Sequence, residues 1–138
     1  MTTAAVLVCD DDPIHRDLIR ASLSPGGHRI YEVDDGDALA AAVDEVRPDI
    51  VILDLRMPTD GLDVLPALRS DAELAPVRVL VLSGATLPAD RAAAYEAGAD
   101  AFVAKPFSPR ELAATVAELL ARPATRTAAG LPAQRAIA

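Results

Sequence analysis

The sequence has a single cysteine, few aromatic residues and no long hydrophobic run. Cys9 cannot form an internal disulfide, so we expect a protein of a reducing compartment. No apolar segment approaches the ~18–20 residues that cross a bilayer. The amino end has no basic region and reaches acidic residues by Asp10, which argues against a signal peptide. We therefore expect a cytoplasmic protein without a membrane partner.

Aromatic side chains make up only 3% of the chain, although 51% of it is apolar. The core of a single domain must then be built from Ala, Val, Leu and Ile. Basic residues are scarce as well, with 13 basic against 21 acidic side chains. Three of the basic side chains and none of the acidic ones lie in the last 17 residues, so residues 1–121 carry a formal net charge of −11. Since phosphate binding needs a basic surface, we expect no nucleic-acid partner.

Short apolar runs alternate with segments of helical periodicity. The runs are Ala5–Cys9, Ile30–Val33, Ile50–Leu53, Val77–Leu82 and Ala101–Ala104. Continuous β-branched runs are typical of strands covered on both faces, and Glu32 makes the second run more polar, as at a sheet edge. The alternation predicts an α/β fold, doubly wound around a five-stranded parallel sheet.

The helical segments carry their own start and stop residues. Asp12 is the expected cap of the first helix, with Pro13 at its first position. One face of this helix collects Ile14, Leu18, Ala21 and Ser22. The other helices are expected over 37–46, after Gly61, from Pro88 to Gly98, and from a capping box at Ser108–Glu111 to about Ala121.

Two further expectations concern helix boundaries and domains. Pro66 falls inside the third helix, which is tolerated if that helix begins late, with Asp63 as its cap. Residues 122–138 are rich in Ala, Pro and Thr, and we interpret them as a flexible tail or a truncated linker after one domain over 1–121.

Polar residues follow four of the predicted strands. The first run ends in Asp10-Asp11-Asp12, and Asp54, Ser83 and Lys105 follow the third, fourth and fifth. Ligands of such sheets bind at the carboxyl ends of the strands. Clustered carboxylates there suit Mg²⁺. Asp54 can attack phosphorus, while Lys105 and the metal neutralise charge and Ser83 donates a hydrogen bond.

Four segments in this order resemble the receiver domains of bacterial response regulators. They are VLVCDDDP at 6–13, DIVILDLRMP at 49–58, VLVLSGA at 79–85 and EAGADAFVAKPF at 96–107. The resemblance covers roughly Ala5 to Ala121. It implies a flavodoxin-like (βα)5 fold with strand order 2-1-3-4-5. It also implies a signalling protein that is not an enzyme beyond assisting its own phosphorylation and dephosphorylation.

The same resemblance implies the site residues. Asp54 matches the phosphoacceptor, and Lys105 and Ser83 match the lysine and the hydroxyl that act with it. The implied Mg²⁺ ligands are Asp10, Asp11, Asp54 and the backbone carbonyl of Arg56, with Asp11 preferred over Asp10 as the direct ligand. Ser83 and Phe102 match the switch positions, and the Lys105–Pro106 bond matches one that is usually cis.

The implied partners are a histidine kinase or phosphotransfer protein as donor and an unknown downstream protein. The latter would read the surface around the fourth helix, fifth strand and fifth helix. A monomer or a phosphorylation-dependent homodimer is expected by the same analogy.

Two alternatives remain beside this interpretation. The stretch LRMPTDG is one residue shorter than is usual in receivers, which favours an interaction module that works without phosphorylation. A phosphohydrolase of the haloacid-dehalogenase kind carries its nucleophile on the first strand in an Asp-x-Asp arrangement followed by a cap module, whereas here the stretch is a continuous Asp10-Asp11-Asp12 and no segment is large enough for a cap. His15 and His28 have no metal-ligand pattern, so we expect both to be surface residues.

Overall fold

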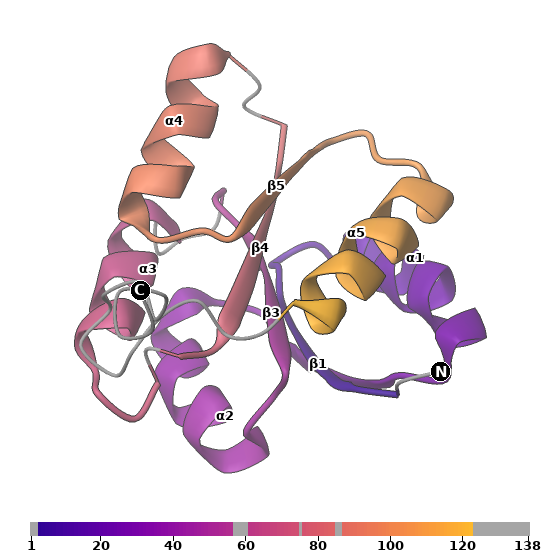
Figure 1. The fold of residues 1–138 in the computed structure, drawn as a ribbon, viewed down its shortest axis with the longest axis horizontal. Helices are drawn as coiled ribbons and strands as arrows, with labels where there is room; N and C mark the ends of the chain where they lie inside the picture. Colours follow the sequence, from indigo (N-terminus) through magenta and orange to yellow (C-terminus); the bar gives the residue numbers. More distant parts are fainter. Residues whose placement is uncertain (1–2, 57–60, 75, 85–86, 123–138) are drawn as a thin grey trace.

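The computed structural model describes residues 3–56, 61–74, 76–84 and 87–122. Its strands are β1 (Ala5–Cys9), β2 (Arg29–Val33), β3 (Ile50–Asp54), β4 (Arg78–Ser83) and β5 (Ala101–Ala104). They form one parallel sheet in the order β2-β1-β3-β4-β5 (Figure 1), so the predicted doubly wound fold and strand order are confirmed. The polar run with Glu32 is an edge strand, as expected.

Five helices connect and follow the strands. They are α1 (Pro13–Leu23), α2 (Leu39–Val46), α3 (Gly61–Ser70), α4 (Pro88–Ala97) and α5 (Pro109–Ala121). The predicted caps are confirmed, because Oδ1 of Asp12 accepts a bond from the Ile14 amide at 2.9 Å and Oγ of Ser108 accepts one from the Glu111 amide at 3.2 Å. Gly98 ends α4 with φ of 122°, a backbone conformation that favours glycine.

The helices cover the sheet on both faces, α1 and α5 on one and α2, α3 and α4 on the other (Figure 1). Alternate residues of each central strand therefore enter two separate cores. Leu7, Val51, Val79 and Val81 pack toward α2, α3 and α4. Val6, Ile50, Leu80 and Leu82 pack toward α1 and α5. Both cores are almost wholly aliphatic, as the low aromatic content predicts.

The buried face of α1 differs from the predicted one. Its buried residues are Ile19, Ser22 and Leu23, whereas Ile14 is 67% exposed and Leu18 is 50% exposed. The helix packs against both the sheet and α5, and this double contact selects a face turned by about one residue from the one predicted. The prediction was wrong for Ile14, Leu18 and Ala21, which is exposed, and right for Ser22.

The late start predicted for α3 is also wrong. The helix begins at Gly61 and contains Pro66. The first four amides of a helix have no intrahelical acceptor. Pro66 is the sixth residue of α3, past these four amides, so it removes one bond of the ladder, the one otherwise directed to Leu62.

Two predicted segments lie outside the described residues: the short loop after Asp54 at 57–60, and the tail beyond Arg122. Of the helices that are described, none combines the length and the apolar composition needed to cross a membrane.

Candidate functional site

The ends of the central strands bring the predicted site residues to one edge of the sheet. Asp10 directly follows β1, Asp54 ends β3 and Ser83 ends β4. In the parallel register Asp54 pairs with Leu82, so Ser83 lies one position further along the neighbouring strand. Ser83 pairs in turn with Ala104, which places Lys105 just beyond the end of β5. The topology alone therefore gathers these groups.

Lys105 joins two buried carboxylates at this edge. Its Nζ lies 3.1 Å from Oδ2 of Asp10 and 3.4 Å from Oδ2 of Asp54. The Asp10 side chain is only 1% exposed and that of Asp54 only 6%. Buried charges of one sign require a compensating charge, and the ammonium supplies it. The Lys105–Pro106 bond is cis, as the resemblance implies.

Burial raises the pKa of Asp54 above its ordinary value, because the charged carboxylate is held out of water. A hydrogen bond from the Arg56 amide to Oδ1, 3.1 Å long, and the charge of Lys105 oppose this effect without cancelling it. The ionised Asp54 thus depends on nearby positive charge. A pair of buried carboxylate oxygens is also the donor set that Mg²⁺ prefers, so the residues present fit this ion.

The remaining predicted residues take different positions. Asp11 is exposed, and Arg56 is exposed except for the amide that contacts Asp54. Ser83 is fully buried. The ring of Phe102 is 7% exposed and packs in the core beneath α4, where the guanidinium carbon of Arg91 lies 4.6 Å from its centroid. The roles assigned to these residues stay predictions.

Gly61 lets α3 begin directly beside the end of β3. Its amide donates to the Leu55 carbonyl at 3.3 Å. A Cβ at this position would lie 2.9 Å from the Asp54 carbonyl oxygen and from the Leu55 Cα, both of them backbone atoms that cannot turn aside. Any larger residue would therefore displace the chain next to Asp54.

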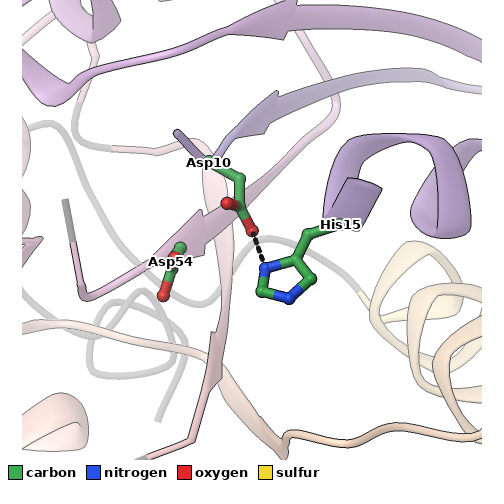
Figure 2. A group of neighbouring side chains, drawn as sticks. All are labelled: Asp10, His15 and Asp54. Carbon is green, nitrogen blue, oxygen red and sulfur yellow. Dashed lines mark ion pairs between the residues drawn. The ribbon is translucent and has the colours of Figure 1, made fainter. Parts of the chain in front are cut away.

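His15 was predicted to be a surface residue, and this prediction was wrong. Its ring is partly buried, with Nδ1 2.9 Å from Nζ of Lys105 and 3.5 Å from Oδ2 of Asp10. Figure 2 shows the ring directed from the start of α1 toward the carboxylates of Asp10 and Asp54. His15 continues the buried face of Ile19 and Ser22 by one turn, a face that only the packing of α1 distinguishes from the one predicted.

An ion-pair network attaches the Asp10 segment to the edge strand. Arg16 donates to the Asp10 carbonyl oxygen at 2.6 Å and to Oε1 of Glu32 at 2.9 Å. Arg20 donates to Oε2 of Glu32 at 3.0 Å. Hydrogen bonds from Arg20 and Arg16 hold the pKa of Glu32 below its ordinary value despite partial burial. The network connects α1, β2 and the backbone of Asp10.

Comparison with known proteins identifies relatives of this arrangement. The family model of the response regulator receiver domain matches residues 6–117. The chain is 39% identical to the DNA-binding response regulator MtrA of Mycolicibacterium smegmatis over 85% of this chain and 50% of that protein. It is 35% identical to the DNA-binding dual master transcriptional regulator RpaA of Synechocystis over 85% and 49%. The chain thus spans about half the length of these relatives.

Solved structures agree with this relationship. Chemotaxis response regulator CheY4 of Vibrio cholerae superposes with a TM-score of 0.79 at 28% identity, over 86% of this chain and 99% of that one. The receiver domain of Francisella response regulator 1452 superposes with a TM-score of 0.78 at 27% identity, over 86% and 97%.

These relatives overturn the expectation that no nucleic acid is involved. Two of them are named as DNA-binding proteins, and this chain matches only about half of each. The net charge of −11 describes residues 1–121 alone, so it does not constrain what an attached output region binds.

Proposed function

The chain belongs to the family of response regulator receiver domains, and on that premise we propose that it is a phosphorylation-dependent signalling switch whose phosphoacceptor is Asp54. Proteins of this family act as signalling modules rather than as enzymes in the ordinary sense. The observation that carries the proposal is the ammonium of Lys105 between the buried carboxylates of Asp10 and Asp54.

The proposed reaction transfers a phosphoryl group from a histidine kinase or phosphotransfer protein. An Asp54 carboxylate oxygen forms a bond to phosphorus while the bond from phosphorus to the donor's histidine nitrogen breaks, and that nitrogen keeps the electron pair. The product is an acyl phosphate on Asp54. The proposed role of Lys105 is to neutralise the charge that develops on the phosphoryl oxygens, and that of Ser83 is to donate a hydrogen bond to them.

Mg²⁺ belongs to the same proposal. Its proposed ligands are Asp10, Asp11, Asp54 and the backbone carbonyl of Arg56. When bound, the ion supplies positive charge beside the phosphoryl oxygens. The raised pKa of Asp54 supports this, because the ionised acceptor needs such charge close by.

The switch itself is proposed to run from the site edge to one lateral surface. Phosphorylation adds charge and acceptor oxygens at Asp54. Ser83 ends β4 and Lys105 directly follows the adjacent strand β5, so a shift at either reaches Phe102 and the surface of α4, β5 and α5. The relatives named as DNA-binding extend well beyond the half of their length that this chain matches.

The test is the intact mass of the chain after incubation with acetyl phosphate and Mg²⁺. We expect one phosphoryl adduct on the wild type and none on Asp54→Ala. Asp44→Ala is the matched control, because Asp44 is exposed on α2 and pairs only locally with Arg47. Equal labelling of wild type and Asp54→Ala contradicts the assignment. A wild type without adduct, even when kinases are offered, favours an interaction module that works without phosphorylation.

A further inference from the structure

Three metal-ligating atoms converge on one point at the site edge. Asp10, His15 and Asp54 each offer one donor atom, and the three atoms lie within 4.8 Å of one another. The Lys105 ammonium contacts all three, at 3.1 Å from Oδ2 of Asp10, 2.9 Å from Nδ1 of His15 and 3.4 Å from Oδ2 of Asp54. The ammonium cation of Lys105 therefore already lies at the point toward which the three donor atoms are directed.

The lone pair of His15 is directed toward this point. An ammonium group has three donors and no acceptor, so Nδ1 must accept the bond from Lys105. The other ring nitrogen, Nε2, then carries the proton, and it lies 3.6 Å from Oδ2 of Asp12. This distance is longer than a hydrogen bond, so Asp12 acts on the ring only as a nearby negative charge.

We propose that His15 makes this centre a mixed nitrogen–oxygen site, which binds borderline divalent transition metals such as Ni²⁺ or Zn²⁺ more tightly than carboxylates alone do. The proposed site shares Asp10 and Asp54 with the Mg²⁺ centre, and the inference rests on the proposed function for its use in signalling. Mg²⁺ binds through oxygen and gains little from an imidazole, whereas Zn²⁺ and Ni²⁺ favour this ligand. His15 therefore sets which cation the site prefers.

The distances support this assignment. Donors held at about 2.0–2.2 Å from one ion lie roughly 3–4 Å apart. Nδ1 of His15 and Oδ2 of Asp10 are 3.5 Å apart before any adjustment. The carboxylates come from the rigid ends of β1 and β3, and His15 comes from the first turns of α1. For a metal to bind, Lys105 has to leave this point, and the three donor atoms, which lie within 4.8 Å of one another, have to draw closer together.

The other cysteine and histidine side chains of the chain lie elsewhere or carry no free thiolate. The sequence has one cysteine and two histidines. Cys9 is fully buried, and burial raises the pKa of its thiol to about 12, so it offers no thiolate at neutral pH. His28 precedes β2, and its Nδ1 accepts the Ala4 amide at 3.1 Å near the start of β1. It serves as a control because it lies at the opposite edge of the sheet.

The experiment is a calorimetric titration of the full chain with Ni²⁺ and, separately, with Mg²⁺. The variants are His15→Asn and, as the matched control, His28→Asn, whose amide oxygen can still accept the Ala4 bond. We expect His15→Asn to lower the ratio of Ni²⁺ to Mg²⁺ affinity at least about tenfold, because loss of even a supporting group near a metal typically costs that much. His28→Asn should leave the ratio unchanged.

A second readout follows the only lysine of the chain, Lys105. In protein labelled with ¹³C- and ¹⁵N-lysine, Zn²⁺ should shift its side-chain resonance in the wild type at concentrations that leave His15→Asn unchanged. An unchanged affinity ratio in His15→Asn, or an equal fall in His28→Asn, overturns the inference. If the wild type forms the Asp54 adduct with Mg²⁺ but His15→Asn leaves the ratio of Ni²⁺ to Mg²⁺ affinity unchanged, this inference is overturned and the proposed function is not. A His15-dependent Ni²⁺ site in a chain that never forms the adduct overturns the proposed function alone.

Discussion

The ammonium nitrogen of Lys105 lies 3.1 Å from Oδ2 of Asp10, although 95 positions separate the two residues in the chain. β1 and β5 are not neighbours in the sheet, since β3 and β4 lie between them. The Lys105 side chain thus extends across the ends of the two central strands. This contact connects the last strand to the first and places a positive charge over Asp54.

Replacing Lys105 by Met should slow phosphorylation of Asp54 by about 100-fold, because one positioned donor to a developing oxyanion is typically worth that much. The rate of adduct formation with acetyl phosphate, followed by intact mass, measures this. Lys105→Arg keeps the charge and should slow phosphorylation less than Lys105→Met does. A Met variant that is labelled at the wild-type rate would show that the ammonium has no part in transfer.

Glu32→Gln should destabilise the fold in a pH-dependent way. The arginines lower the pKa of Glu32 from its usual 4.5, so its contribution is fully present above that value and is lost as pH falls through the lower, folded-state pKa. The expected cost is about 0.5–1 kcal/mol near pH 7, as for a partly exposed ion pair. The difference from wild type should shrink on acidification below about pH 4.5 and on addition of salt.

Urea unfolding at several pH values measures this difference. Glu45→Gln, at an exposed position of α2, is the control and should change stability little at any pH. A loss in Glu32→Gln that stays constant down to acid pH would contradict the ion-pair explanation.

Arg69 should be among the most costly charged residues to remove. It is 8% exposed, its Nη2 lies 2.9 Å from Oδ2 of Asp100, and its Nε donates to the Gly98 carbonyl at 3.0 Å. Arg69→Met leaves a partly buried carboxylate without this partner and should cost about 3 kcal/mol of unfolding free energy. Arg47→Met, which removes an exposed guanidinium, should cost less than about 1 kcal/mol. Urea unfolding measures both costs, and a similar loss of unfolding free energy in the two variants would refute the special role of Arg69.

The contact between Arg91 and Phe102 can be isolated by a double-mutant cycle. Arg91→Gln should lower the unfolding free energy by about 0.5–1 kcal/mol in the wild-type background. In the Phe102→Leu background the same change should cost much less, because the cation then has no ring to contact. Equal losses in both backgrounds would show that Arg91 contributes through some other contact.

The sequence predicted most of the sheet because its strands are continuous apolar runs that end at charged or hydroxyl residues. Asp54, Ser83 and Lys105 follow such runs, and the parallel topology alone brings them together. Glu32 marked the edge strand because it makes the second run more polar than the others. These features are local in the sequence, so no tertiary information was needed to find them.

His15 could not be found in this way, because its position depends on the rotation of α1. Ile14 and Leu18 form as good an apolar pair as Ile19 and Leu23, and periodicity alone does not choose between the two faces. Contact with α5 selects the face of Ile19. As a result His15 points to the site rather than to the surface, because the observed buried face of α1 is shifted by one residue from the predicted face.

The most direct test of the account locates the phosphoryl group in the chain. After incubation with acetyl phosphate and Mg²⁺, borohydride reduces an aspartyl phosphate to homoserine, which peptide mass spectrometry assigns to a residue. The account predicts homoserine at position 54 and at no other aspartate. Homoserine at Asp10, Asp11 or Asp12, or a labelled chain with none at Asp54, would contradict it.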